Sequence, residues 1–343
     1  MIYKNIDIHN AAELIPCGDG GVTWSRVPLE LREKLDGDGG KQQVLNSTGV
    51  ELRFAVIGES VTLRLKAIEH CKGLSSIFHI FRGGIQGSWE DHELNNYIGC
   101  GTTDVVIKRS ANLDTLTRMS KLSNTSFAPE IVRVIFDRGY YEIVDIIGDV
   151  VPPKAEQLPS KTVLFYGSSI THGSNSIDTS HSYTALTSRA LDFDTLNLAM
   201  AGNCRMEPAM ADHIAALGVG GAWDIAVMEL GINVLSWGDD LIDERASYMI
   251  RRVASENPDK PIVVISPLYC CDDFNDNGKN ANRWRSALER IVKREALKNI
   301  TYISGLELLG DMSLISADEV HPNIYGAWQI AERLVPRLKQ ILH

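Results

Sequence analysis

The fold is decided by ten residues near the middle of the chain, Thr162-Val163-Leu164-Phe165-Tyr166-Gly167-Ser168-Ser169-Ile170-Thr171. The first five are too uniformly apolar for a strand with one face in water, and they indicate a buried strand of a parallel sheet. The glycine and the two serines that follow place small residues at the carboxyl end of this strand. Four further runs of the same kind occur along the chain, at residues 195–199, 225–228, 262–265 and 301–303.

Segments with helical periodicity separate these runs. Apolar residues recur at intervals of three and four, as in Met206, Met210, Ile214 and Leu217, and a last stripe over residues 324–338 predicts a C-terminal helix. Alternation of strands and helices predicts a doubly wound α/β domain around a five-stranded parallel sheet.

The first half of the chain has a period of two instead. Apolar residues alternate over residues 52–56 and 61–65 on either side of a turn at Gly58, which predicts a hairpin. Short runs at residues 77–81, 103–108, 131–136 and 141–147 extend the pattern, and no convincing amphipathic helix interrupts them. We expect an antiparallel, jelly-roll-like β-sandwich, which serves either as a sugar-binding or docking module or as an inert scaffold.

A proline-rich segment separates the two patterns. Pro152, Pro153 and Pro159 lie within eight positions, and prolines in that number fit neither a central strand nor a helix interior. We therefore predict a sandwich domain over residues 1–151, a linker over 152–160 and an α/β domain over 161–343.

Composition narrows the classes of partner. The chain has 343 residues and a formal net charge of −10, without a long Lys/Arg cluster, which argues against nucleic acid or an anionic membrane and favours a small substrate. No leader and no long apolar run indicate export or membrane insertion, so we expect a cytoplasmic protein. The cysteines are too scattered to predict a disulfide framework or a zinc site, and we expect no metal and no cofactor. They are Cys17, Cys71, Cys100, Cys204, Cys270 and Cys271. Oligomerisation is left open.

Polar or small residues follow three of the predicted strands. Ser169 follows the first, Gly202 the second and Asn233 the third, at the sheet edge where open parallel sheets bind ligands. Asp318 and His321 come just before the last helix. Their spacing lets the carboxylate accept a hydrogen bond from one imidazole nitrogen while the other faces the sheet edge, where it meets Ser169.

This combination resembles the SGNH, or GDSL-type, hydrolase family of serine esterases. The resemblance implies a flavodoxin-like sheet with Ser169 as nucleophile, His321 as base and Asp318 as the residue that orients it. It also implies an oxyanion hole formed by the backbone N–H groups of Ser169 and Gly202 and the side chain of Asn233. A serine needs such a base to attack an ester, and the charge that forms on oxygen needs preorganised donors.

The resemblance covers residues 161–343, and the sandwich is more loosely similar to the accessory domain of some GDSL-like acylhydrolases. Two positions depart from the family pattern. Ser168 stands where the family most often has aspartate, and Val234 replaces another frequent aspartate. Neither is one of the four defining residues, so the departures bear on loop hydrogen bonding and substrate class.

The resemblance implies hydrolysis of a small acyl ester, with an acetyl group on a carbohydrate as the leading substrate, through an acyl-enzyme on Ser169. Acyl transfer to a hydroxyl acceptor uses the same residues and is the alternative within enzymes. A non-catalytic carbohydrate-binding protein with a degenerate hydrolase domain is the alternative of another class. Taken singly, each candidate residue is also explained as a turn or a helix cap.

Two further sets of residues have a functional and a structural interpretation. Tyr183, Met206, Trp237 and Tyr269 follow or flank the predicted strands and would line an acyl pocket, although such side chains more often belong to a core. Asp178 and His181 form a pair of the kind that usually caps a helix rather than binds a metal.

Overall fold

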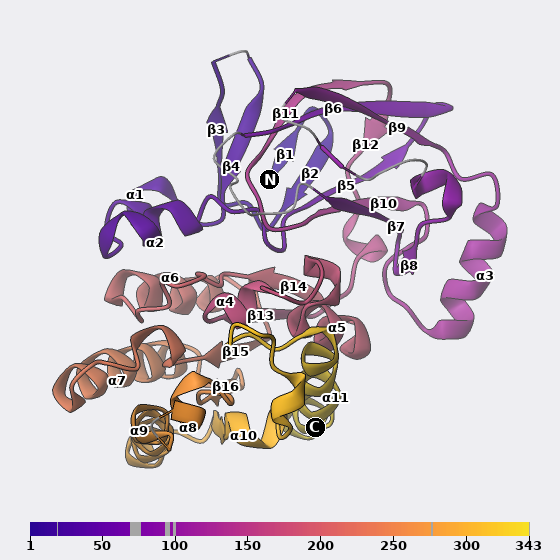
Figure 1. Cartoon of the computed structure of the whole chain (residues 1–343). Coiled ribbons are helices and arrows are strands. Elements are labelled where there is room, and N and C mark those ends of the chain that lie inside the picture. Colours follow the sequence, from indigo (N-terminus) through magenta and orange to yellow (C-terminus); the bar gives the residue numbers. More distant parts are fainter. Residues whose placement is uncertain (19, 69–76, 93–96, 99–100, 276, 343) are drawn as a thin grey trace.

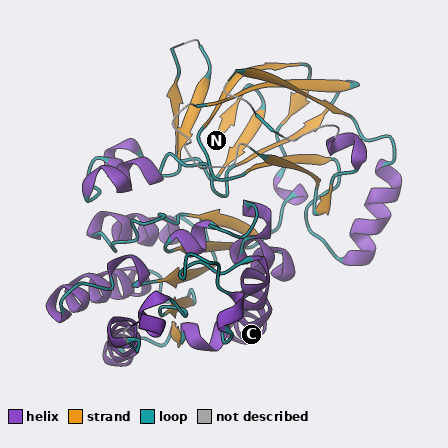
Figure 2. Ribbon diagram, in the orientation of Figure 1, coloured by secondary structure: helices purple, strands orange, loops and turns teal. Residues whose placement is uncertain are grey.

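A computed structural model of the chain describes residues 1–18, 20–68, 77–92, 97–98, 101–275 and 277–342. A β-sandwich built from the first half lies on one side of an α/β domain built from the second (Figures 1 and 2). The predicted fold class is confirmed in both halves.

The α/β domain contains a parallel sheet in the strand order β14-β13-β15-β16-β17 within the described residues. Its strands are β13 (Thr162–Tyr166), β14 (Asp194–Asn197), β15 (Ile225–Glu229), β16 (Ile262–Ile265) and β17 (Ile300–Ile303). Because β13 lies between β14 and β15, the loops that follow these three strands open side by side at one edge of the sheet.

Helices cover both faces of this sheet, as the alternation predicts. On one face, Leu164, Tyr166 and Met228 pack against α6 (Pro208–Val219), α7 (Asp239–Glu256) and α9 (Lys279–Glu295). On the other face, Val163 and Phe165 pack against the helices of the opposite layer. Those helices are α4 (Ser169–His172), α5 (Tyr183–Leu191), α10 (Gly305–Leu308) and α11 (Ile324–Ile341), and α8 (Cys271–Asn275) precedes α9.

The sandwich consists of two antiparallel sheets around one apolar core. The first has the order β1-β2-β5-β10-β7-β8, with β12 also paired to β5, and the second has the order β3-β4-β11-β6-β9. Their bounds are β1 (Ile2–Tyr3), β2 (Ile6–His9), β3 (Glu13–Pro16), β4 (Val22–Ser25), β5 (Glu51–Val56), β6 (Ser60–Ala67), β7 (Phe78–Arg82), β8 (Ile85–Gln86), β9 (Thr102–Lys108), β10 (Ile131–Phe136), β11 (Tyr141–Ile147) and β12 (Val150–Val151).

The predicted hairpin around Gly58 is wrong. Strand β5 pairs with β2, β10 and β12 in the first sheet, whereas β6 pairs with β9 and β11 in the second. Leu52 and Leu63 nevertheless reach the same core from opposite sides. Alternation identifies the apolar face of a strand but not its partner strand, so the turn crosses between sheets instead of closing a ladder.

The expectation of a sandwich without helices is also wrong. The helices α1 (Leu29–Arg32), α2 (Gly37–Gln43) and α3 (Leu113–Ser123) interrupt the strands. Helix α3 buries Leu116 and Ser120 but leaves Leu122 exposed. Apolar residues recur at intervals of three along α3, at Leu113, Leu116, Met119 and Leu122, so the helical pattern was present in the sequence and was missed.

Helices α1 and α2 pack onto the α/β domain, above α6 in Figure 1. Leu31 and Leu35 belong to the same buried cluster as Met200. Nearby, the buried guanidinium of Arg26 donates to the carbonyl oxygens of Asn197 and Ala199, both at 2.8 Å. The N-terminal half therefore supports the segment that leads from β14 to Gly202.

A second contact between the halves is ionic. Arg53 of β5 donates two hydrogen bonds of 2.7 Å to the carboxylate of Asp194 at the start of β14, and a third of 2.8 Å to Glu51. The three side chains are almost fully buried. Burial opposes their ionisation, but the neighbouring arginines hold the pKa of Glu51 at about 2, so it stays charged and paired.

In the described part of the chain, none of the helices has the length and apolar character needed to cross a membrane. Among the described residues, Cys204, Cys270 and Cys271 are free thiols. Cys71 and Cys100 lie outside the described residues. Cytoplasmic location and the three domain boundaries stay predictions.

Candidate active site

Ser169 is the first residue of α4, directly after the turn that ends β13. The hydroxyl of Ser168 accepts a hydrogen bond from the backbone N–H of Ile170 at 3.1 Å and so caps this short helix. Gly167 is required here, since a Cβ at this position would lie 2.2 Å from Oγ1 of Thr171. The turn presents Ser169 with a relative exposure of 8%.

A chain of hydrogen bonds links Ser169 to two residues that are more than 140 positions away in the sequence. Oγ of Ser169 lies 2.6 Å from Nε2 of His321, and Nδ1 of His321 lies 2.7 Å from Oδ2 of Asp318. An ionised carboxylate only accepts, so the proton of the neutral imidazole is on Nδ1 and Nε2 accepts from the serine hydroxyl. The structure thus brings together the three residues that the sequence placed at the sheet edge.

A local turn holds Asp318. Its Oδ1 accepts from the backbone N–H groups of Val320 at 3.0 Å and His321 at 2.9 Å, while Oδ2 also accepts from Nδ2 of Asn175 at 2.6 Å. Partial burial opposes ionisation, but the hydrogen bonds from the backbone and ring of His321 and from the backbone of Val320 outweigh it and hold the pKa of Asp318 below its ordinary value. The carboxylate is therefore charged at neutral pH.

Gly202 and Asn233 lie in the loops on either side of the turn before Ser169. The backbone N–H of Met200 donates to the carbonyl of Gly167 at 2.8 Å, which fixes the loop of Gly202 beside that turn. Oδ1 of Asn233, in the short helix η4 (Ile232–Val234), accepts from the N–H of Cys204 at 3.0 Å. The two flanking loops are thereby tied to each other.

Three donors remain available at this edge. Within the described residues, the N–H groups of Ser169 and Gly202 and Nδ2 of Asn233 have no hydrogen-bond acceptor. Gly202 has φ +68°, and a Cβ built on it would meet no atom within 4 Å, so open space lies against its backbone. Donors without acceptors beside open space are suited to bind an oxygen with negative charge.

Sequence reasoning missed Glu229, the last residue of β15. This carboxylate is buried beneath the turn, where its Oε2 accepts from Ser168 N–H at 2.9 Å, Ser168 Oγ at 2.5 Å and Thr171 Oγ1 at 3.2 Å. Burial raises the pKa of Glu229, although these hydrogen bonds oppose the rise. A charged residue that ends an otherwise apolar strand was the available signal.

Glu229 also accounts for the departure at Ser168. The family most often has a carboxylate at that position, whereas here Ser168 donates to a carboxylate supplied by the neighbouring strand. Val234, the second departure, is buried in the cluster on the face of the sheet covered by α6, α7 and α9.

The other candidate residues, for an acyl pocket and for a metal pair, lie mostly in structural roles. Tyr183 and Met206 are buried in the two cores of the α/β domain, so for them the structural interpretation holds, and Trp237 packs against Trp284 with ring centroids 6.3 Å apart. Asp178 accepts from the backbone N–H of His181 at 3.1 Å and lies 2.9 Å from its ring Nδ1, which is the capping arrangement. Tyr269 is half-buried.

The fold and the hydrogen-bonded serine, histidine and aspartate define the class of the molecule as a serine ester hydrolase of the α/β type. The chain belongs to the GDSL-like lipase/acylhydrolase family, whose model matches residues 160–339. The matched segment coincides closely with the α/β domain.

Solved structures resemble this one over nearly its whole length. A salicylyl-acyltransferase from a tetracycline biosynthetic pathway has a TM-score of 0.74 at 16% identity, covering 98% of this chain and 95% of the other. A putative GDSL-like lipase from Bacteroides ovatus has a TM-score of 0.67 at 18% identity, covering 98% and 97%. A family two carbohydrate esterase from Cellvibrio japonicus has a TM-score of 0.59 at 15% identity, covering 99% and 96%. At such identities the likeness shows the shared fold, and no curated protein matches the sequence.

Proposed function

We propose that this hydrolase removes small acyl groups, acetyl foremost, from hydroxyl groups of a carbohydrate through an acyl-enzyme on Ser169. The observation that carries the proposal is the continuous chain from Ser169 Oγ through His321 to Asp318, beside three donors without acceptors. Each part of ester cleavage has a residue suited to it in this arrangement.

The geometry supports the following course of reaction. His321 Nε2 takes the hydroxyl proton as Ser169 Oγ bonds to the ester carbon, and the carbonyl oxygen becomes an oxyanion that accepts from Ser169 N–H, Gly202 N–H and Asn233 Nδ2. Protonated His321 then gives the proton to the departing alcohol oxygen, which leaves the acyl group on Ser169. A water molecule, deprotonated by His321, attacks this ester, and the returning proton restores the serine hydroxyl.

The solvent exposure of the site supports an ester substrate whose alcohol portion is bulky. The side chains of His321 and Asp318 have relative exposures of 21% and 40%, so the reacting hydroxyl is reached from solvent instead of through a deep channel. An ester group that projects from a polymer reaches such a surface without threading. The solved structures named as carbohydrate esterases support the same choice of substrate.

Acyl transfer to a hydroxyl acceptor is the second candidate, favoured by the resemblance to a salicylyl-acyltransferase. It requires an alcohol to compete with water for the acyl-enzyme. Turnover of p-nitrophenyl acetate with and without added xylobiose or butanol separates the two. Acylated acceptor as the main product would establish transfer, whereas acetate alone supports hydrolysis.

The nucleophile is tested with Ser169→Ala against the matched change Ser174→Ala, five residues further along the chain. We expect Ser169→Ala to lose at least about 10⁴-fold in kcat on p-nitrophenyl acetate and Ser174→Ala to keep wild-type turnover. Equal turnover by Ser169→Ala and the wild type would refute the acyl-enzyme. It would also reopen the non-catalytic alternative.

The substrate class is tested separately. Acetylated xylo-oligosaccharides and ethyl acetate carry the same acyl group on different alcohols, and we expect kcat/KM to be at least about 100-fold higher on the sugar esters, a difference of about 2.7 kcal/mol. Equal values on both would reject a carbohydrate substrate while leaving the esterase chemistry intact.

A further inference from the structure

A large cavity lies in the sandwich. Its volume is about 1020 Å³, and it opens between β7 and the edge strand β8 of the first sheet and the edge strand β9 of the second. Helix α3 and the short helix η1 (Trp89–His92) complete it. All the lining residues lie between Phe78 and Met119, so the cavity belongs to a different domain from Ser169.

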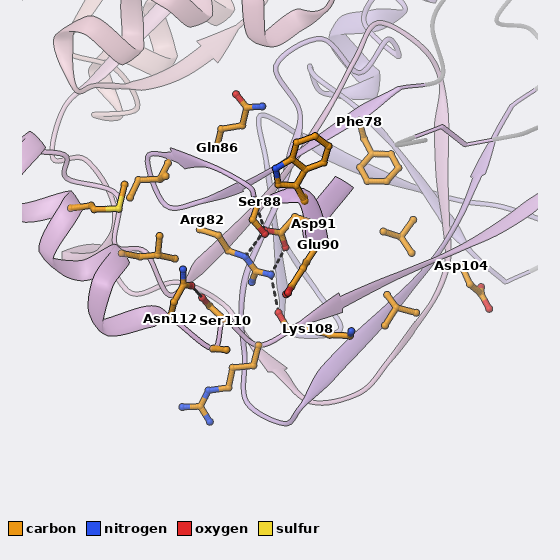
Figure 3. A pocket seen from close by; sticks show the side chains of 18 of the residues that line it. Phe78, Arg82, Gln86, Ser88, Glu90, Asp91, Asp104, Lys108, Ser110 and Asn112 are labelled. Atoms are coloured by element: carbon orange, nitrogen blue, oxygen red, sulfur yellow. Dashed lines mark hydrogen bonds and ion pairs between the residues drawn. The ribbon is translucent and has the colours of Figure 1, made fainter. Parts of the chain in front are cut away.

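The floor of the cavity is polar and fixed. Arg82 and Asp91 form an ion pair whose side chains are only 9% and 8% exposed. Arg82 also donates to the carbonyl of Lys108 at 2.8 Å, and Ser88 N–H donates to Asp91 at 3.0 Å (Figure 3). The charges of the floor cancel, and its geometry is set before any ligand arrives.

The remaining lining is close to neutral as well. Lys108 and Arg109 are balanced by Glu90 and Asp104, and Asp104 is further paired with Arg64 through hydrogen bonds of 2.8 and 2.9 Å. A phosphate, a nucleotide or an acidic peptide would find no excess of positive charge here. The charge distribution therefore favours an uncharged ligand.

Exposed aromatic rings lie beside these polar groups. Trp89 has a relative exposure of 93% and Tyr97 one of 55%, and both line the cavity. Rings this exposed contribute little to folding and remain available for contact with a ligand.

Polar side chains around the rings are free to bind. Among the residues that the structure describes, Gln86, Glu90 and Lys108 make no side-chain hydrogen bond or ion pair with a protein group. Ser110 Oγ donates to Asn112 Oδ1 at 2.8 Å and leaves the Asn112 amide nitrogen as a donor (Figure 3). Apolar ring faces among free donors and acceptors match the C–H faces and hydroxyl groups of sugar rings.

We propose that this cavity binds a chain of uncharged sugars, with pyranose faces stacked on Trp89 and Tyr97 and hydroxyl groups bonded to the surrounding polar side chains. A lipid or an apolar peptide would bury Gln86 and Glu90 without partners, which costs free energy. The inference goes beyond the proposed reaction, because it gives the sandwich a binding role that does not depend on Ser169.

Binding is measured by titration calorimetry with the full chain in the Ser169→Ala background, so that no turnover interferes. The probes are xylohexaose, cellohexaose and mannohexaose. We expect at least one to bind, and Trp89→Ala to weaken that binding at least about tenfold. Trp328→Ala removes a half-exposed tryptophan on α11 of the α/β domain and should leave the affinity unchanged.

A second variant guards against a folding defect. Trp89→Phe keeps a stacking ring and should retain affinity within about threefold, with the melting temperature of the parent. In the Ser169-intact chain, Trp89→Ala should hydrolyse p-nitrophenyl acetate at the wild-type rate. A failure of sugar binding is thus distinguished from a failure of the esterase proposal.

Three results would overturn the inference. The first would be that none of the three hexasaccharides binds, and the second that Trp328→Ala weakens binding as much as Trp89→Ala does. Alternatively, sedimentation velocity shows that the parent chain self-associates and that Trp89→Ala is monomeric, in which case the occupant is a second copy of the chain.

Discussion

The two sides of the candidate active site are held in place by different means. The turn that carries Ser169 rests on the buried carboxylate of Glu229 and on neighbouring strands, whereas His321 is held by a short exposed turn around Asp318 and by Asn175. One side is part of the core, and the other is attached to it by a few surface hydrogen bonds. This difference predicts that changes on the first side affect both folding and reaction, while changes on the second affect the reaction with little change in stability.

The largest effect should come from the exposed side. His321→Ala removes the base and should lower kcat on p-nitrophenyl acetate by about 10⁴-fold or more, because the serine hydroxyl is a poor nucleophile without it. The melting temperature should stay within about 1 °C, since the ring is partly exposed. A fall of many degrees would show that this loop also carries the fold and would end the contrast.

Asn233→Ala should follow, with a loss of about 10²- to 10³-fold in kcat if its amide stabilises the oxyanion. Its Oδ1 also accepts from Cys204, so the variant tests whether the flanking loops depend on it. Asn233→Asp keeps this acceptor but removes the donor, and it should lose activity to a similar extent without losing stability. Wild-type kcat in both variants would remove Asn233 from the site.

Glu229→Ala should affect both properties. It leaves the N–H and hydroxyl of Ser168 buried without an acceptor, at a cost of about 1–3 kcal/mol each, and the melting temperature should fall by several degrees. We expect kcat to fall about 10- to 100-fold as Ser169 loses its fixed position. Glu229→Gln retains an acceptor oxygen and should recover most of both losses. A Gln variant as poor as the Ala variant would contradict a positioning role.

The smallest effects concern pH and have opposite signs on the two sides. The pKa of Glu229 is raised, so the folded state favours its neutral form, and the stability of the wild type declines as the pH rises through that pKa. The melting temperature of Glu229→Gln should therefore rise relative to that of the wild type between pH 4 and pH 8. The pKa of Asp318 is lowered, so its contribution is present above about pH 4 and is lost as pH falls further.

The wild type should therefore exceed Asp318→Asn by about 1 °C at neutral pH and by nothing near pH 2. Melting curves measured across this range by circular dichroism report both slopes. Parallel slopes for the two variants would remove the electrostatic contrast between the two sides.

The residues at the sheet edge were predictable because parallel topology determines where strands end. Runs of apolar residues located β13, β14 and β15, and the residues after them had to share one edge, which placed Ser169, Gly202 and Asn233 together. The spacing of Asp318 and His321 gave the local turn. The structure brings these residues together as expected, while their catalytic roles stay proposals.

The missed features depend on partners far away in sequence. Glu229 becomes significant only when β13 and β15 are neighbours, and Asn175 only when its loop lies beside Asp318. Pairing in the sandwich was misjudged for a related reason, because alternation over residues 52–56 and 61–65 is the same whether the strands share a sheet or face each other. Side-chain patterns record burial, and contacts between distant segments require the fold.

The hydrogen bonds of the Arg26 guanidinium have a consequence for any attempt to produce the α/β domain alone. A polypeptide starting at the proline-rich segment would lack the group that binds the carbonyls of Asn197 and Ala199. It would also uncover the side chain of Met200, two residues before Gly202. Deletion of the sandwich should therefore loosen the loop that leads from β14 to Gly202 in the candidate active site. The loop therefore depends on both halves of the chain, and the solved structures with a similar fold also cover nearly its whole length.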